Sequence, residues 1–160
     1  MKRELKVFLI FLCCCIMIPL ILIILFNYDN EKLTSLGNIS DYNLTNGYIT
    51  IIDDVQQTKN KTTIYGCSLK LGENLDYVNK QYVLVDDENR VIGINTVVTD
   101  RTSATEYFND GFNYDKSGLN GQFATKYINN EVNYKIGILI KEKNGATYLV
   151  ISDRIIGGKN

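Results

Sequence analysis

The sequence predicts an all-β domain, an antiparallel β-sandwich of about seven strands, preceded by one N-terminal transmembrane helix. Three observations predict this fold class. Twenty uncharged residues lie together near the N-terminus. From Gly47 onward, short β-branched and aromatic runs alternate with turn residues, a pattern typical of strands. No long segment after residue 46 has the apolar period of a helix. Two antiparallel layers are therefore expected outside the membrane.

The uncharged run extends from Val7 to Phe26, VFLIFLCCCIMIPLILIILF. Twenty helical residues span roughly 30 Å, about the thickness of the bilayer hydrocarbon core. Three cations precede the run, namely Lys2, Arg3 and Lys6, and two acids follow it closely, namely Asp29 and Glu31. By the positive-inside rule, residues 1–6 are cytoplasmic and the C-terminal part is extracytoplasmic.

A cleaved signal peptide is the alternative interpretation of residues 7–26, because a charged segment also precedes the apolar run of such peptides. The run is longer than the usual apolar region of about 7 to 15 residues, and no A-x-A-like site follows Phe26. We therefore expect an uncleaved signal anchor and a single-pass protein of the cell membrane. Cys13, Cys14 and Cys15 lack the small preceding residues of a lipobox and are interpreted as apolar residues in lipid.

Composition excludes several functions of the outer part. Beyond residue 26 the chain keeps 14 of its 17 basic and 17 of its 18 acidic residues, a formal charge of −3, which does not favour nucleic-acid binding. The sequence contains no histidine, so it lacks the commonest general base and metal ligand. Cys67 is the single cysteine beyond the apolar run, which excludes an intramolecular disulfide and a Cys/His zinc site. We expect no cofactor.

Residues 27–46 are polar, rich in Asn and Asp, and are interpreted as a linker before a domain over residues 47–157. The expected strands lie at 48–55, 62–71, 81–86, 91–99, 122–128, 134–142 and 146–155. Asn144-Gly145 predicts a tight hairpin between the last two strands. Residues 102–109 are the exception, where Thr102 or Ser103 is expected to cap a helical turn.

Alternation assigns the faces of the strand at 134–142. Tyr134, Ile136, Ile138 and Ile140 share one face, and Leu139 shares the other with Lys135, Gly137 and Lys141. One face is therefore predicted to cover the core and the other to lie largely in water.

Five motifs occur in an order that resembles a small bacterial β-sandwich module of Ig-like character: Gly66-Cys67-Ser68-Leu69, Tyr82 to Asp86, Val91-Ile92-Gly93, Asp100-Arg101 and Ser117 to Gly121. The resemblance implies an Ig-like fold outside the membrane. It also implies a non-catalytic role, as in modules appended to membrane glycosyltransferase-like or envelope proteins. Cys67 stands where the family pattern has tryptophan, which weakens a glycan-stacking role. Thr102-Ser103-Ala104 stands where Pro-Asp-Val is usual.

The long segment 101–121 is the first place to expect a binding surface, because function collects on long loops of a rigid scaffold. The candidate binding residues are Arg101, Tyr107, Phe112 and Tyr114. Arg101 lies among Asp100, Glu106 and Asp110 and has the fork of an anion clamp. The favoured interpretation is a structural salt bridge that pins the loop 100–121 onto the sandwich.

Other groups carry weaker hypotheses. Residues 109–120 offer oxygen ligands suited to calcium, but their spacing differs from an EF-hand, so a solvated loop is favoured. Asp53-Asp54 and Asp86-Asp87-Glu88 could act as paired carboxylates, although hairpin acids are usually turn residues. Cys67 with Arg101 is similar to the pair of sortases, but the histidine base is missing.

These observations predict a membrane-anchored, non-catalytic binding module at a bacterial cell envelope, with a glycan or a protein as partner and no nucleic acid or metal. Two alternatives remain open. One is a small envelope hydrolase that uses carboxylates, and the other is an accessory subunit of a larger membrane complex.

Overall fold

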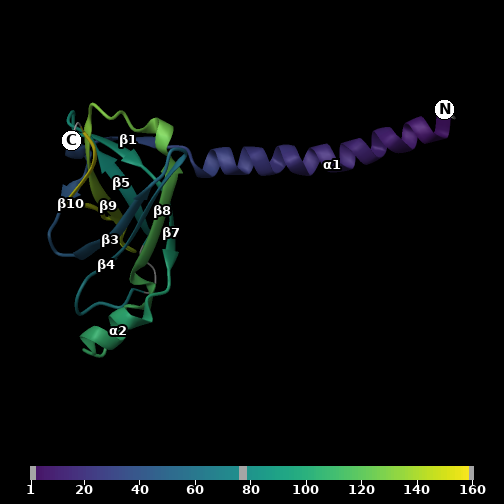
Figure 1. The fold of residues 1–160 in the computed structure, drawn as a ribbon. Helices are drawn as coiled ribbons and strands as arrows, with labels where there is room; N and C mark the ends of the chain where they lie inside the picture. Colours follow the sequence, from purple (N-terminus) through teal and green to yellow (C-terminus); the bar gives the residue numbers. More distant parts are fainter. Residues whose placement is uncertain (1–2, 76–78, 159–160) are drawn as a thin grey trace.

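A computed structural model describes residues 3–75 and 79–158. Helix α1 (Arg3–Asn30) projects from a β domain that contains the rest of the described chain (Figure 1). Its part from Ile10 to Asn30 is long and apolar enough to cross a membrane, consistent with the predicted single-pass anchor. Lys2, used above to predict a cytoplasmic N-terminus at residues 1–6, lies outside the described residues.

The β domain consists of two sheets. Sheet A has the order β1-β6-β5-β9-β10-β2 and sheet B the order β3-β4-β8-β7. The strands are β1 (Thr34–Asn38), β2 (Asn43–Leu44), β3 (Ile49–Gln57), β4 (Lys61–Leu69), β5 (Asn79–Val85), β6 (Arg90–Gly93), β7 (Asn95–Thr99), β8 (Gly118–Ala124), β9 (Asn133–Lys141) and β10 (Thr147–Gly157). All pairs are antiparallel except β10 with β2. The predicted β class is confirmed, but about seven strands was too low a number for the described chain.

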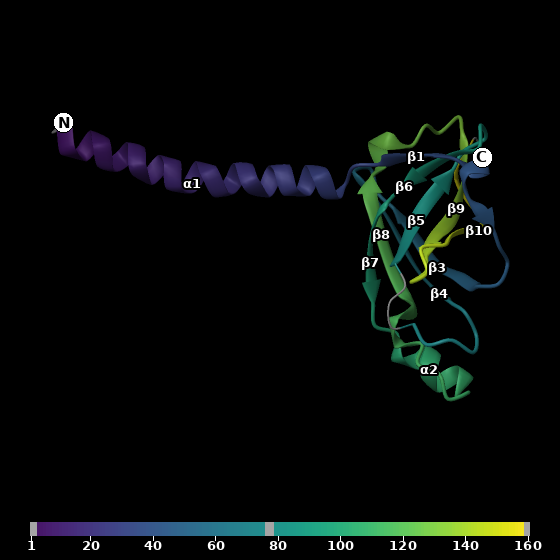
Figure 2. The same cartoon turned by 180° about the vertical axis from the view of Figure 1, so that it is seen from behind.

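One expected strand, at 91–99, is divided between the two sheets. Residues before Ile94 form β6 in sheet A, and those after it form β7 in sheet B. Ile94 N donates a hydrogen bond to Tyr82 O at 2.9 Å, and Tyr82 N donates to Thr96 Oγ1 at 2.9 Å. The chain thus passes from one sheet to the other beside β5. Sheet A curls into a half-barrel (Figure 2).

The expected linker at residues 27–46 is instead part of the ordered fold. Helix α1 continues to Asn30, β1 pairs with β6, and β2 pairs with β10. The physical reason lies on the outer face of sheet A, which is apolar: Val83, Val85, Val91 and Leu149 are buried there. Leu36, Ile39 and Tyr42 of the supposed linker cover these side chains. The polar composition of residues 27–46 concealed these three apolar residues, which the outer cluster of sheet A requires.

The same cover corrects the predicted faces of β9. Tyr134, Ile136, Ile138 and Ile140 do belong to the main core between the sheets. The opposite face is only partly in water, because Leu139 packs in the outer cluster beneath residues 33–44.

Tyr82 fills the space between the two sheets. It points from sheet A toward two glycines of sheet B, and its side chain is fully buried. A Cβ on Gly66 would lie 2.7 Å from Tyr82 Oη and 2.2 Å from Ile51 O, and one on Gly121 would lie 2.6 Å from Tyr82 Cδ2. The glycines therefore admit the ring, because real Cβ atoms do not approach so closely.

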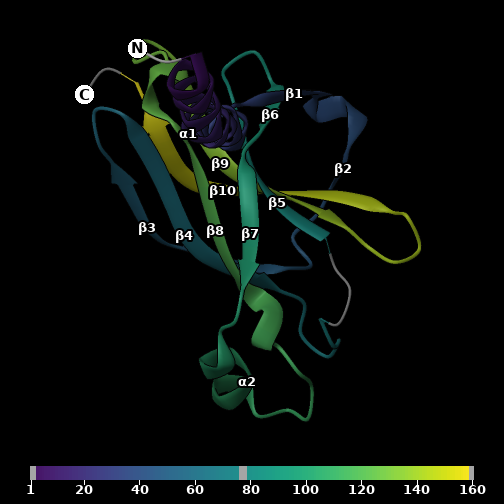
Figure 3. The ribbon, with the colours of Figure 1, turned by 90° about the vertical axis from the view of Figure 1, so that its right-hand side faces the viewer.

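Helix α2 (Thr102–Phe108) lies at one end of sheet B, in the connection from β7 to β8 (Figures 1 and 3). The expected helical turn is present, but its N-cap is Arg101 and no side chain caps it, so the expected cap by Thr102 or Ser103 was wrong. Short 3₁₀ turns are η1 (Ile39–Asp41), η2 (Asp115–Ser117) and η3 (Thr125–Tyr127). The expected strand at 122–128 begins earlier, as β8, and ends before η3.

Candidate functional site

The candidate site is a groove between α2 and the outer face of sheet B. Its volume is about 340 Å³, within the range of small-ligand pockets. Residues of β3, β4 and the α2 segment line it, most of them apolar: Ile49, Ile51, Cys67, Leu69, Arg101, Ser103, Ala104, Tyr107 and Phe108. We call this cavity the α2 groove.

Strand alternation forms the floor of the α2 groove. Ile49 and Ile51 lie two residues apart on β3 and pair with Leu69 and Cys67 of β4, so all four side chains point to the same face. Ile51 remains 47% exposed, whereas Leu69 and Cys67 are buried. An exposed isoleucine beside buried apolar residues marks where a covering group is missing.

A small second core holds the helical wall of the groove. Ala104 of α2 is buried against Leu69, Leu75 and Tyr114, and Phe108 packs on the same cluster. The rings of Phe108 and Tyr114 meet edge to face, with centroids 5.5 Å apart. This packing fixes α2, a helix too short to be stable by itself.

Arg101 stands at the rim of the groove in a two-point ion pair with Asp53. Arg101 Nη1 lies 2.5 Å from Asp53 Oδ2, and Nη2 lies 3.2 Å from Oδ1. Asp53 occupies an irregularity in the pairing of β3 with β4. The structural salt bridge expected of Arg101 is present, with Asp53 of β3 as its acid, whereas the neighbouring Asp100 pairs with Lys116 at 2.5 Å. The ion pair ties the α2 segment to β3 and neutralises both groups.

The three aromatic candidates have different environments. Tyr107 is 83% exposed and lines the α2 groove. Phe112 is exposed but lies outside the residues that line it. Tyr114 is fully buried; its hydroxyl donates to Asp110 Oδ2 at 2.6 Å and accepts from Gly72 N at 2.8 Å. Tyr114 therefore belongs to the second core, and its expected role in a binding surface was wrong.

The oxygen-rich segment 109–120 uses its side chains within the loop. Asp110 Oδ1 accepts from Phe112 N, and Asn113 Oδ1 accepts from Asp115 N at 2.8 Å. Asp115 Oδ1 accepts from Thr105 Oγ1 at 2.6 Å. The first two contacts join residues two apart and are those of turns, and the third ties the loop to α2. In the described ranges, no three His, Cys, Asp or Glu side chains are grouped as metal ligands.

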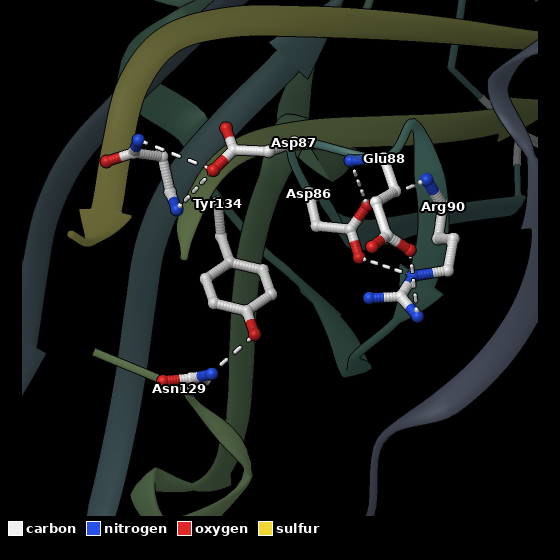
Figure 4. A network of polar contacts seen from close by, with 7 residues as sticks. Asp86, Asp87, Glu88, Arg90, Asn129 and Tyr134 are labelled. Carbon is white, nitrogen blue, oxygen red and sulfur yellow. Dashed lines mark hydrogen bonds and ion pairs between the residues drawn. The ribbon is translucent and has the colours of Figure 1, made fainter. Parts of the chain in front are cut away.

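The acidic cluster after β5 organises a turn (Figure 4). Asp86 is 5% exposed; its Oδ1 accepts from Glu88 N at 3.0 Å and from Arg90 N at 2.9 Å. Its Oδ2 accepts from Arg90 Nε at 2.7 Å. Burial alone would raise the pKa of Asp86, but these hydrogen bonds outweigh burial and lower the pKa below its usual value. Asp87 Oδ2 accepts from Asn133 N at 3.1 Å.

Cys67 and Lys80 are two buried titratable groups that interact with each other. Burial raises the pKa of the Cys67 thiol at the groove floor, which disfavours the thiolate. Lys80 is 3% exposed, its Nζ donates to Ser68 O, and burial lowers its pKa to about 8. Lys80 was not predicted to be buried, although extending the alternation of Tyr82 and Leu84 back by two residues assigns it to the core face.

Comparisons of the chain with protein-family models, with curated proteins and with solved structures found no match.

Proposed function

We propose that the chain is a membrane-anchored, non-catalytic interaction module of a bacterial cell envelope that binds an extended segment of a partner protein. The observation that carries this proposal is the α2 groove, which lies beside an unpaired sheet edge. The apolar helix α1 and the resemblance to Ig-like envelope modules support the expected place of the domain outside the membrane.

The free edge belongs to β3, which ends sheet B and pairs only with β4 among the described strands. Every second backbone N–H and C=O of such a strand is available to another extended chain. Asp53, Asp54 and the irregular pairing near them protect the second half of β3 from added strands. The residues from Ile49 to Ile52 come before these two acids on β3 and lie beside the groove. A partner strand therefore has its place at this half.

The groove selects the partner's side chain. A strand added to β3 directs alternate side chains to the outer face of sheet B, where the groove lies. The lining is mostly apolar, and Asp53 neutralises Arg101 at the rim. We therefore expect an aliphatic or aromatic side chain of the partner to enter it, with Tyr107 covering the contact.

Photo-crosslinking of the full chain in its native membranes tests this proposal. A benzophenone amino acid replaces Ile51 or Tyr107, and the matched control replaces Val97. Val97 is 61% exposed on β7, the opposite edge of sheet B. We expect one partner protein to crosslink from the two groove positions and not from the control. Equal crosslinking from all three positions would contradict a specific groove.

Two substitutions then test the groove and the edge of β3, one each. Ser103→Trp fills the groove from an exposed position of α2, and Ile51→Lys places a charge beside the free edge. Each should abolish the crosslink at Tyr107 without lowering the melting temperature. Val97→Lys should leave the crosslink unchanged. Retention of the crosslink in both groove variants would exclude strand addition at β3.

A further inference from the structure

The C-terminal end of α1 is fixed to the β domain by polar contacts. Asn95 Nδ2 at the start of β7 donates to Asn30 Oδ1 at 2.9 Å and to Asn30 O at 3.3 Å. Ala124 N at the end of β8 donates to Glu31 O at 3.0 Å. Strand β1 begins at Thr34, so only a few residues separate the helix from sheet A. The domain therefore has little freedom to swing about the helix end.

A cation and two tyrosines gather at this junction. Lys126 Nζ lies 5.7 Å from the ring centroid of Tyr28 in α1 and 5.1 Å from that of Tyr127. Tyr28 follows the apolar run by two residues, about 3 Å along the helix axis, and is 54% exposed. This position is the depth of the lipid headgroups if residues 7–26 fill the hydrocarbon core. The ring contacts bring η3 to the same depth.

We infer that η3 is a lipid-contact surface, on which Lys126 binds the phosphate group of a phospholipid in the adjacent leaflet. Tyrosine is enriched at this depth because its ring is apolar and its hydroxyl is polar. Lys126 is exposed, and among the described residues its ammonium contacts two rings without forming an ion pair. The negative charges of Asp29 and Glu31 offset the positive charges of Lys32 and Lys126. The junction is therefore not attracted by the negative surface potential of a membrane, and the group that Lys126 recognises is the phosphate itself.

This contact gives the domain a fixed orientation on the membrane. Viewed along α1 from its N-terminus, β7 lies in front of sheet A (Figure 3). Strand β2, the blue strand at the left edge of Figure 1, lies on the side remote from α1. Helix α2 lies beyond the C-terminal end of α1 and to one side of its axis (Figures 1 and 2), so the α2 groove is held off this axis.

Tryptophan fluorescence can test the contact directly, because the chain contains no tryptophan. Tyr127→Trp reports on η3, and Leu44→Trp is the control at an exposed position on the remote strand β2. Each full-length variant is reconstituted into phosphatidylcholine vesicles with a nitroxide on the lipid headgroup. We expect quenching at position 127 to exceed that at position 44 at least twofold, as interfacial depth requires. Equal quenching at both positions would overturn the inference.

Substitution of the cation separates phosphate binding from proximity alone. In the Tyr127→Trp background, Lys126→Glu should reduce the quenching and Lys126→Arg should retain it, since guanidinium also binds phosphate. Vesicle flotation should be unchanged in all variants, because α1 alone supplies the anchor. Unchanged quenching in Lys126→Glu would show that the ammonium does not bind lipid.

Discussion

The turn between β5 and β6 and the segment that carries α2 each hold an arginine against an aspartate, in different ways. Arg90 and Asp86 are four residues apart, and Asp86 is buried with both oxygens occupied (Figure 4). Arg101 and Asp53 are 48 residues apart, and both side chains are about one third exposed. The first pair closes a local turn. The second joins two distant segments at the rim of a groove.

This difference separates stability from function. A buried carboxylate with several donors costs much free energy when its partners are lost, whereas an exposed ion pair contributes little. We therefore expect the turn to stabilise the fold and the Arg101 pair to position the α2 groove. Four substitutions test this division, from the largest expected effect to the smallest.

Asp86→Ala should lower the free energy of unfolding by about 3 kcal/mol, because it leaves buried amides without an acceptor. Urea denaturation of the detergent-solubilised chain, followed by circular dichroism, measures this loss. Since the pKa of Asp86 is lowered in the folded state, its stabilisation is present above the unfolded pKa near 4 and is lost as pH falls further. An effect as small as that of Arg101→Ala would refute the comparison.

Lys80 sharpens the comparison, because it is a buried charge that forms no ion pair with the described carboxylates. Its pKa is about 8 in the folded state, against 10.5 ordinarily, so the unfolded chain binds more protons between these values. Stability contributed by this site therefore rises with pH. From pH 8 to 9 the gain should be about 1 kcal/mol, by proton linkage.

Lys80→Met should remove this rise in stability. The measurement compares the two chains by urea denaturation at pH 7, 8 and 9. Burial raises the pKa of Cys67 and of Tyr82, whose contributions are lost at higher pH, but both chains contain these groups. The difference between the chains therefore reports Lys80 together with its electrostatic interaction with Cys67. Parallel pH profiles would show that the buried amine keeps its proton up to pH 9 in the folded state, as it does in the unfolded chain.

The pattern of strands could be predicted well because it depends on local alternation. Six of the seven expected segments, including 134–142, overlap single strands. The seventh, 91–99, changes sheet at Ile94. This change depends on hydrogen bonds to the backbone of β5, which the alternation of residues does not predict. Residues 33–44 were missed because their cover of sheet A depends on a tertiary surface and not on composition.

The candidate site was predicted in part for the same reason. Arg101 and Tyr107 line the α2 groove, and their loop was singled out by its length. Tyr114 occurs in the same aromatic loop but is buried, because Leu69 and Leu75 from elsewhere in the chain form a core around it. The floor residues Ile49 and Ile51 were missed, since an outward-facing isoleucine on a strand has no signal in sequence until α2 is placed.

Arg101→Ala tests the second half of the comparison. The stability change should be about 0.5 kcal/mol, typical of partly exposed ion pairs. The crosslink from Tyr107 to the partner should nevertheless fall, because the α2 segment loses its contact with β3. Asp53→Asn is the matched control, which keeps the shape of the acceptor and removes its charge. A large loss of stability with an unchanged crosslink would assign this pair to the fold.

Lys116→Ala should have the smallest effect. Lys116 pairs with Asp100, and both side chains are more than half exposed. The contact is as short as that of Arg101 with Asp53, at 2.5 Å, so distance alone would assign the two pairs equal importance. Solvent screens this contact, and holding the long lysine side chain in one conformation costs entropy. We therefore expect the free energy of unfolding to change by less than about 0.3 kcal/mol. Lys116→Ala should also leave the Tyr107 crosslink intact, because Lys116 does not line the α2 groove. If Lys116→Ala reduced stability and the crosslink as much as Arg101→Ala does, the two-point contact of Arg101 with β3 would not be what holds the groove. Any ion pair close to α2 would then have the same effect.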